Sequence, residues 1–214
     1  MDTLLYVLLG VVAGFLLVYA IWRLASRLLA LPCPSWIKWV VEMDNPFARV
    51  CHAEFIIEHL HLEDGMEVAD IGCGPGRVTI PLARALEGRG KVTAVDVQEG
   101  MIEAVKQKAV AVGMENIEYL RTGVGEGRLG SERFDRAVLV TVLGEIPDRE
   151  AAMEEIYGAM KPGGILSISE MIFDPHFQRR AIVTQLATKA GFVEQKFFGK
   201  SMAYTMHFMK PERA

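Results

Sequence analysis

The sequence has little of what marks a disulfide-rich, metal-binding or nucleic-acid-binding protein. Its 214 residues include only three cysteines, Cys33, Cys51 and Cys73, without C-x-x-C or Cys/His ligand spacing. This pattern argues against a disulfide framework and a zinc site and is typical of a reducing compartment. The formal net charge is −4, and no block of Lys and Arg is interleaved with aromatic residues. We therefore expect no nucleic-acid partner and no bound metal.

Charge is also absent from the start of the chain, where residues 3–22 carry no ionisable side chain apart from Tyr6 and Tyr19. A helix of this length spans roughly 30 Å, the thickness of a bilayer core, so the sequence predicts a transmembrane helix over residues 1–25. A cleaved signal peptide is the alternative, but it would have a basic start and a shorter apolar run. Arg23, Arg27 and Lys38 follow the apolar run and none precedes it. This asymmetry predicts a single-pass membrane protein whose main domain is cytoplasmic.

Residues 26–50 form a predicted linker in which cations and tryptophans alternate with apolar residues. Trp36 and Trp39 are suited to the headgroup layer, so an amphipathic interfacial segment is one interpretation and a helix packed on the domain surface is the other. Gly10 and Gly14 form a G-x-x-x-G pattern that would allow a homodimer through the transmembrane helix. The ordinary glycine content of membrane helices explains the same pattern, and we favour that explanation.

From residue 51 onward the chain alternates helical and strand-like patterns, which predicts an α/β domain over residues 51–214. Such alternation is typical of a mostly parallel sheet with helices on both faces, which binds ligands beyond the carboxyl ends of its strands. The expected helices are 55–62, 78–87, 101–113, 149–160 and 178–191, and the expected strands are 66–72, 90–97, 116–122, 134–144, 163–170, 192–199 and 203–209.

The stretch "VADIGCGPG" (68–76) places glycines at positions 72, 74 and 76 directly after the first expected strand. Glycines there let the backbone turn sharply and approach a ligand closely, next to the amide groups of the following helix. Asp96 ends the next strand, where a carboxylate can accept hydrogen bonds from both hydroxyls of a ribose. A dinucleotide loop would need a glycine where Arg77 stands, so a nucleoside ligand is favoured over NAD and an oxidoreductase is disfavoured.

Four segments in this order resemble the class I S-adenosylmethionine-dependent methyltransferases: "VADIGCGPG", "VTAVDVQEGM", "FDRAVLVTVLGEIPD" and "MKPGGILSISE". The resemblance covers most of the last 160 residues. It implies a Rossmann-like, seven-stranded, mostly parallel sheet in which the last strand, 203–209, is inserted antiparallel. It also implies S-adenosyl-L-methionine as the cofactor.

The same resemblance implies roles for individual residues. The loop from Asp70 to Gly76, including Gly72, Cys73 and Gly74, would hold the methionine end of the cofactor, and Asp96 would hold the ribose. The adenine would lie by Val97, Met101, Gly125 and Glu126, and the floor under the sulfonium would be Val142 and Leu143. Many relatives carry an acid where this chain has Val124, so adenine recognition would rest on Glu126 or on backbone groups.

Four side chains near the ends of the fourth, fifth and last strands are candidate catalytic groups: Glu145, Glu170, His176 and Tyr204. Methyl transfer needs an aligned nucleophile and the exclusion of water, and it needs a base only when the acceptor is protonated. Structural roles, such as a helix cap or a buried hydrogen bond, are the alternative for each. His59 and His61 are two residues apart and do not share a helical face, so they predict no metal pair.

The anchor decides the expected acceptor, because it holds the domain within a few tens of ångströms of the bilayer and favours lipid-like molecules. We place a phospholipid amine headgroup slightly ahead of a prenylated quinone or an apolar thiol. A membrane-tethered module that binds the cofactor without turnover is the alternative from another class.

Overall fold

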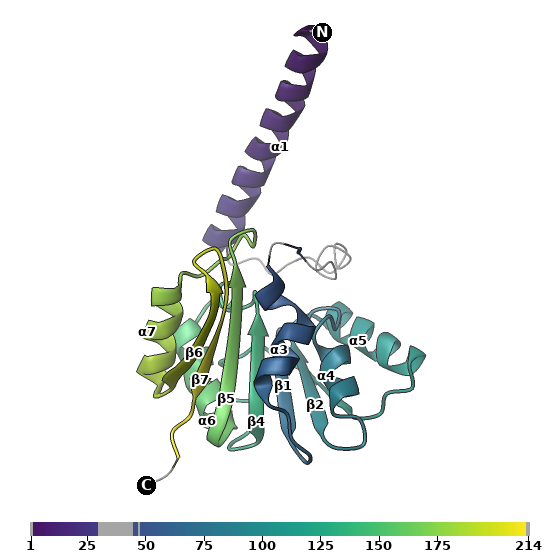
Figure 1. Cartoon of the computed structure of the whole chain (residues 1–214), viewed down its shortest axis with the longest axis vertical. Helices are drawn as coiled ribbons and strands as arrows, with labels where there is room; N and C mark the ends of the chain where they lie inside the picture. Colours follow the sequence, from purple (N-terminus) through teal and green to yellow (C-terminus); the bar gives the residue numbers. More distant parts are fainter. Residues whose placement is uncertain (1, 30–44, 47, 213–214) are drawn as a thin grey trace.

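The computed structural model describes residues 2–29, 45–46 and 48–212, and its most prominent feature is a long N-terminal helix, α1 (Asp2–Leu29), standing clear of a compact domain (Figure 1). The segment Thr3–Ala25 contains an 18-residue stretch with a mean hydropathy of 2.6, and none of that stretch is buried in the domain. This helix is long and apolar enough to cross a membrane. It continues past the predicted end at residue 25. Gly10 and Gly14 lie on it with open space around them, and the homodimer stays a prediction.

Most of the predicted interfacial linker, including Trp36 and Trp39, lies outside the described residues, so its amphipathic character stays a prediction.

A seven-stranded sheet forms the centre of the domain and confirms the predicted fold class. Its order is β3-β2-β1-β4-β5-β7-β6, and β7 pairs antiparallel with both β5 and β6. The remaining neighbours pair in parallel, so the predicted antiparallel insertion of the last strand is confirmed. The strands are β1 (Glu67–Ile71), β2 (Lys91–Asp96), β3 (Ile117–Arg121), β4 (Phe134–Val140), β5 (Met160–Met171), β6 (Val193–Lys200) and β7 (Ala203–Met209).

Helices cover both faces of this sheet because its strands send alternate apolar side chains to opposite sides. Val68 belongs to one buried cluster, with residues of α3, α4 and α5, and its neighbour Ala69 belongs to the other, with residues of α6 and α7. The described helices are α3 (Ala53–Leu60), α4 (Thr79–Ala85), α5 (Glu99–Ala111), α6 (Arg149–Ala159) and α7 (Arg180–Ala190), with a short 3₁₀ turn, η2 (Arg49–Cys51), before α3.

At the functional edge, the largest difference from the predicted bounds is the end of β4. Strand β4 ends at Val140 rather than at residue 144, because Thr141 has a φ of 57° and turns the chain out of the sheet. Helix α4 begins at Thr79, one residue after the predicted start, and Arg77 and Val78 lie in a turn.

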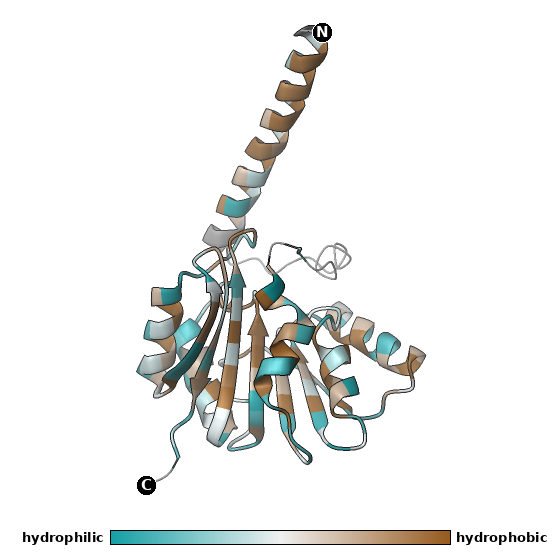
Figure 2. Cartoon of the chain, in the orientation of Figure 1, coloured by the Kyte–Doolittle hydropathy of each residue, from teal (hydrophilic) through white to brown (hydrophobic). Residues whose placement is uncertain are grey.

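The apolar helix contacts the domain at the carboxyl ends of the parallel strands. The Tyr19 hydroxyl donates a 3.0 Å hydrogen bond to the carbonyl of Phe173, and Arg23 Nη1 donates one of 2.8 Å to the carbonyl of Ile172. Both carbonyls lie just beyond β5, which points toward α1 in Figure 1. Figure 2 shows the helix as brown along most of its length and teal where it reaches the domain. The edge that binds ligands in such sheets is therefore the edge next to the apolar helix.

Candidate active site

The backbone of the loop after β1 packs closely against the turn that follows β4. Gly72 has a φ of +70°, and a Cβ atom at this position would lie 2.5 Å from both methyl carbons of Val142. Only glycine fits such a position without strain and collision. Gly74 and Gly76 also have positive φ angles, so residues 72–76 form a glycine-rich bend at the carboxyl edge, as predicted.

Asp96 lies at the end of β2, directly beside this bend. Its Oδ2 accepts a 3.0 Å hydrogen bond from the Gly74 amide, and its Oδ1 accepts one of 2.8 Å from the Gln98 amide. Burial raises the pKa of Asp96 above its usual value, although these backbone amides act in the opposite direction. Each carboxylate oxygen can accept a further hydrogen bond, so the group retains acceptor capacity for a ribose. The adjacent Val97 side chain is 53% exposed, whereas Met101 is buried in the first turn of α5.

Three residues of the predicted cofactor set have side chains that point into the protein. The Asp70 carboxylate accepts a 2.6 Å hydrogen bond from the Thr79 hydroxyl, and burial raises the pKa of Asp70 to about 6. Cys73 packs in the cluster with α3, α4 and α5, and burial raises the pKa of its thiol. Leu143 is fully buried in the opposite cluster. We therefore expect these side chains to hold the loops in place, and the position of Leu143 beneath the sulfonium stays a prediction.

The predicted adenine side is formed by the loop after β3. The Thr122 amide donates to the Asp96 carbonyl at 3.1 Å, and the Thr122 hydroxyl donates to Glu126 Oε2 at 3.0 Å. Glu126 thus lies near the end of β2, and its role beside the adenine stays a prediction. The amides of Gly125 and Leu129 both donate to the carboxylate of Glu155 on α6. No motif marks Glu155 in the sequence, because its partners lie far away along the chain.

The turn after β4 connects the cofactor edge to the candidate catalytic residues. Val142 faces Gly72, and its carbonyl accepts a 2.9 Å hydrogen bond from the Glu145 amide. Thr141, which begins the turn, is a β-branched residue in the left-handed region, a conformation that costs on the order of 1–3 kcal/mol. Such strain is typical of functional turns whose geometry is fixed by their surroundings.

A cavity of about 530 Å³ opens on the other side of this turn. Its lining residues come from α1, the turn after β4, the start of α6, the segment after β5 and α7, namely Arg23, Gly144, Arg149, Ile172, His176, Phe177, Gln178, Arg179 and Ile182. A Cβ atom on Gly144 would lie 1.9 Å from the His176 carbonyl, so glycine is needed where the two segments meet. His176 lies in the wall, as expected of a candidate catalytic residue. Sequence reasoning did not single out Arg149 or Gln178.

Glu170 and Tyr204 lie directly behind the cavity wall. Glu170 Oε2 accepts a 2.9 Å hydrogen bond from the Gln178 amide, and Glu170 Oε1 is buried without a hydrogen-bond partner among the described residues. Burial raises the pKa of Glu170 to about 8. The Tyr204 hydroxyl donates a 2.7 Å hydrogen bond to the Gln178 carbonyl, and burial raises its pKa. The four predicted catalytic residues thus gather around one region, but only His176 lines the cavity.

Comparison with known proteins agrees with this geometry. Residues 68–164 match the model of a methyltransferase domain family. The chain is 31% identical over 111 residues to a demethylmenaquinone methyltransferase from Staphylococcus aureus and 29% identical to one from Staphylococcus epidermidis. In each case the match covers 52% of this chain and 45% of the relative. The chain thus matches about half the length of these curated relatives.

Solved structures share the fold at low sequence identity. A SAM-dependent methyltransferase from Aquifex aeolicus superposes with a TM-score of 0.71 at 21% identity, covering 84% of this chain and all of that one. The [4+2]-cyclase SpnF superposes with a TM-score of 0.68 at 17% identity, over 75% of this chain and 81% of the cyclase. The second example shows that this fold alone does not fix the reaction.

The residues present fit S-adenosylmethionine. The bend at residues 72–76 leaves no room for a side chain at Gly72, Asp96 can accept hydrogen bonds from ribose hydroxyls, and the exposed Val97 offers an apolar contact for adenine. The family match spans both of these strand ends. The chain therefore contains a class I S-adenosylmethionine-dependent methyltransferase domain, and S-adenosylmethionine is the cofactor of that family.

Proposed function

We propose that this protein transfers a methyl group from S-adenosylmethionine to a small acceptor dissolved in the membrane, with a quinone-type ring as the acceptor. The observation that carries the proposal is the position of Arg23. This residue belongs to the apolar helix and also lines the cavity beside the turn that carries Val142 and Glu145. If this helix spans a membrane, the membrane surface lies next to the reaction edge of the domain.

Exposed apolar side chains support this orientation. Phe173 and Met202 are 59% and 60% exposed, and the Ile172 amide donates a 2.7 Å hydrogen bond to the Met202 carbonyl, so the two loops that carry them are adjacent. They lie beside the foot of α1, where Tyr19 binds the Phe173 carbonyl. Apolar side chains around the end of a membrane helix are suited to the interfacial layer of a bilayer.

The chain's own residues would align the acceptor and receive its proton. Bound S-adenosylmethionine supplies a methyl group that is already activated on a sulfonium. The turn from Val142 to Glu145 would position the acceptor, because it contacts both the glycine bend and the cavity. When the acceptor gains the methyl group, it loses a proton from the attacked atom. His176 is the base in reach of the cavity, and Glu170 lies behind it.

The names of the curated relatives favour the quinone as acceptor. Those relatives are demethylmenaquinone methyltransferases, and a quinone nucleus with an apolar tail is a membrane-dissolved molecule. The phospholipid amine headgroup, which the sequence alone placed first, has weaker support, because burial raises the pKa of Glu170 to about 8 and leaves its carboxyl group mostly protonated at neutral pH. The two acceptors make different predictions in one assay.

The test is to incubate the full chain in lipid nanodiscs with methyl-labelled S-adenosylmethionine and a total membrane lipid extract that contains demethylated quinones. We expect the label in the quinone fraction. Label in the phospholipid fraction would replace the quinone with the amine headgroup, and label only in water-soluble products would contradict the membrane acceptor altogether. Normal cofactor binding without any labelled product would indicate a binding module without turnover.

A further inference from the structure

Three arginines line the cavity next to α1, and methyl transfer as proposed does not use their charge. They are Arg23, Arg149 and Arg179. Within residues 2–29, 45–46 and 48–212, no carboxylate forms an ion pair with any of the three. Arg149 donates to the carbonyls of Leu143 and Gly144, at 3.2 and 3.1 Å, and Arg23 Nη1 donates to Tyr19 and Ile172.

Nearby acidic groups form no ion pair with these arginines in the described part of the chain. Glu170 interacts electrostatically with Arg149, but burial raises the pKa of Glu170 to about 8, so most of it is protonated at neutral pH. The Asp174 carboxylate accepts a 2.7 Å hydrogen bond from the His176 amide. Arg149 uses Nε and one terminal nitrogen for its carbonyl contacts, and a guanidinium carries five N–H donors. Donors therefore remain for an anionic ligand.

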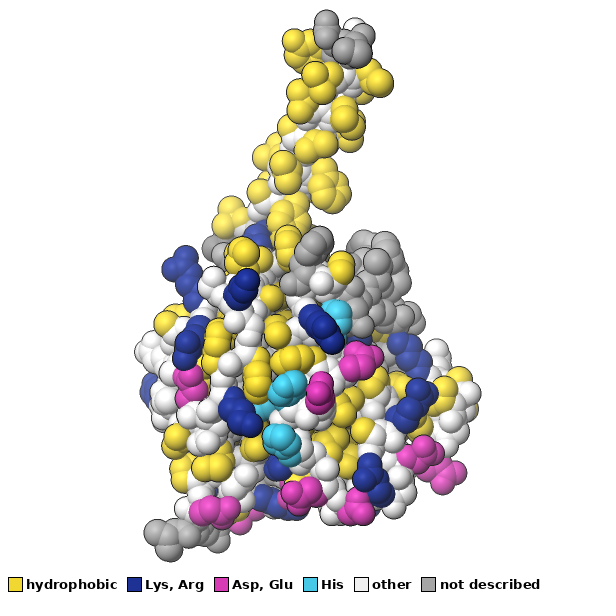
Figure 3. All heavy atoms as spheres, in the orientation of Figure 1, with side chains coloured by type: hydrophobic (Ala, Val, Ile, Leu, Met, Phe, Trp, Pro, Cys, Tyr) yellow, Lys and Arg dark blue, Asp and Glu magenta, His cyan; other side chains and the backbone are white. Residues whose placement is uncertain are grey.

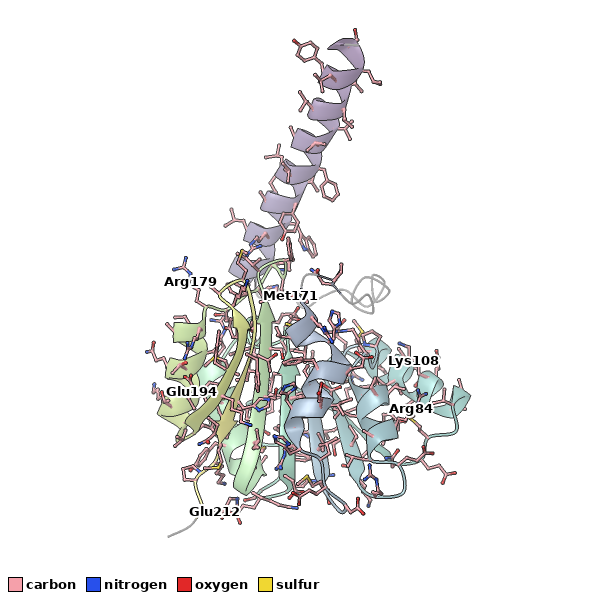
Figure 4. The ribbon with its side chains drawn as sticks, viewed as in Figure 1. Arg84, Lys108, Met171, Arg179, Glu194 and Glu212 are labelled. Carbon is pink, nitrogen blue, oxygen red and sulfur yellow. The ribbon has the colours of Figure 1, made fainter. Side chains whose placement is uncertain are left out.

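The position of the cavity indicates where such an anion comes from. Arg23 lies near the end of the apolar stretch Thr3–Ala25, where a membrane helix reaches the headgroup layer. On the face drawn in Figure 3, the side chains next to the helix include dark blue ones and no magenta ones, whereas both colours occur in the middle of the domain and at its far end. Figure 4 shows Arg179 projecting from this same end of the domain, not far from Met171 at the foot of α1.

We propose that the cavity lined by Arg23, Arg149 and Arg179 binds the phosphate of a membrane lipid headgroup. Guanidinium groups match the geometry of phosphate oxygens and form charge-assisted hydrogen bonds with them. Ile172, Phe177 and Ile182 line the same cavity and offer apolar contact to the glycerol backbone of the lipid. Basic pockets beside membrane helices on the cytoplasmic side are suited to anionic headgroups. The site is a lipid contact next to the reaction edge, and it rests on the proposed membrane placement of that edge.

The experiment measures lipid retention on the full chain by native mass spectrometry from detergent micelles, with phosphatidylglycerol, with diacylglycerol and with glycerol phosphate. We expect retention of phosphatidylglycerol and none of diacylglycerol, which lacks the phosphate. Replacement of Arg149 with Gln should weaken the apparent affinity for phosphatidylglycerol roughly tenfold, about the loss of one charge-assisted contact. Arg179→Gln, at an exposed position, should weaken it in the same direction even if Arg149→Gln folds poorly.

Arg84→Gln is the matched control, because Arg84 is exposed on α4, in the other half of the domain in Figure 4. It should retain the lipid as the unmodified chain does. Equal retention by the Arg149 and Arg179 variants, or equal retention of diacylglycerol, would overturn the proposal. Displacement of the lipid by glycerol phosphate at comparable concentration would assign the site to a soluble phosphate ester instead. Cofactor binding and methyl transfer are measured separately, so their failure does not mimic failure of the lipid site.

Discussion

Glu170 and Tyr204 face each other across the β5–β7 ladder, and both bind the backbone of Gln178. The Gln178 amide donates to Glu170, and its carbonyl accepts from the Tyr204 hydroxyl. Because Gln178 lines the cavity, this buried pair fixes the position of the cavity wall. Two residues that sequence reasoning placed among the candidate catalytic groups thus have a definite positioning role.

The raised pKa of Glu170 predicts a pH-dependent stability. Its folded-state pKa of about 8 lies above the ordinary value of 4.5, so the unfolded chain ionises first as the pH rises. The stability from this group is present in full below about pH 4.5 and is lost as the pH rises through about 8. Glu170→Gln should remove this loss, which is on the order of a few kcal/mol since each pKa unit corresponds to about 1.4 kcal/mol.

The measurement is unfolding of the full chain in detergent, followed by near-UV circular dichroism between pH 5 and 8. The unmodified chain should become less stable toward pH 8 relative to the Gln variant. Parallel stability curves for the two proteins would contradict the assignment.

Tyr204→Phe should reduce stability and leave methyl transfer within a few fold of the original rate. The hydroxyl makes one buried hydrogen bond to the Gln178 carbonyl, worth about 1 kcal/mol. Its raised pKa makes it a poor base near neutral pH. Unfolding and initial rates, measured on the same preparation, test both parts. A hundredfold loss of rate with little loss of stability would show that the hydroxyl takes part in the reaction.

Asp96→Asn should weaken binding of S-adenosylmethionine by about 10- to 100-fold, the effect of losing charge-assisted hydrogen bonds worth about 1.5–3 kcal/mol. Isothermal titration with the cofactor measures the change. Glu99→Gln is the control, because Glu99 begins α5 close by and its carboxylate forms an exposed ion pair with Arg121. Equal affinities for the Asn variant and the control would remove Asp96 from the cofactor site.

Gly72→Ala should weaken cofactor binding and destabilise the domain, because its Cβ would collide with Val142 and its φ of +70° disfavours a side chain. The left-handed conformation costs about 1–2 kcal/mol by itself. Adding Val142→Ala removes the two colliding methyl groups, so the double variant should regain the part of the loss caused by the collision. A double-mutant cycle on unfolding free energy measures this coupling. Additive effects would mean that the two residues do not meet in solution.

Local patterns predicted most of the fold. The strand 203–209 has the predicted bounds, and the glycine bend and Asp96 lie together because parallel strands end at one edge. Thr141 was missed, since a β-branched residue in the left-handed region has no local signal. The side-chain directions of Cys73 and Leu143 could not be predicted, because both residues lie in loops, where no helical or strand periodicity relates sequence position to burial.

Long-range contacts account for what the sequence did not predict about the site. Arg23 binds the Ile172 carbonyl from a distance of 149 positions along the chain, and Glu155 binds the Gly125 and Leu129 amides from α6. Each residue alone reads as an ordinary charge at the end of a membrane helix or on a helix surface. Only the folded arrangement brings Arg23 to the cavity and Glu155 to the cofactor edge.

The docking of α1 onto the two carbonyls after β5 affects how the domain would meet its acceptor. Tyr19 and Arg23, one helical turn apart, donate hydrogen bonds to the carbonyls of two consecutive residues. These two contacts restrict rotation of the domain relative to α1. An enzyme held this way would meet its reactant by lateral diffusion in one leaflet, with the active-site mouth already turned toward that layer. A domain tethered by a longer linker, without the two side-chain contacts, would not keep this fixed orientation toward the membrane.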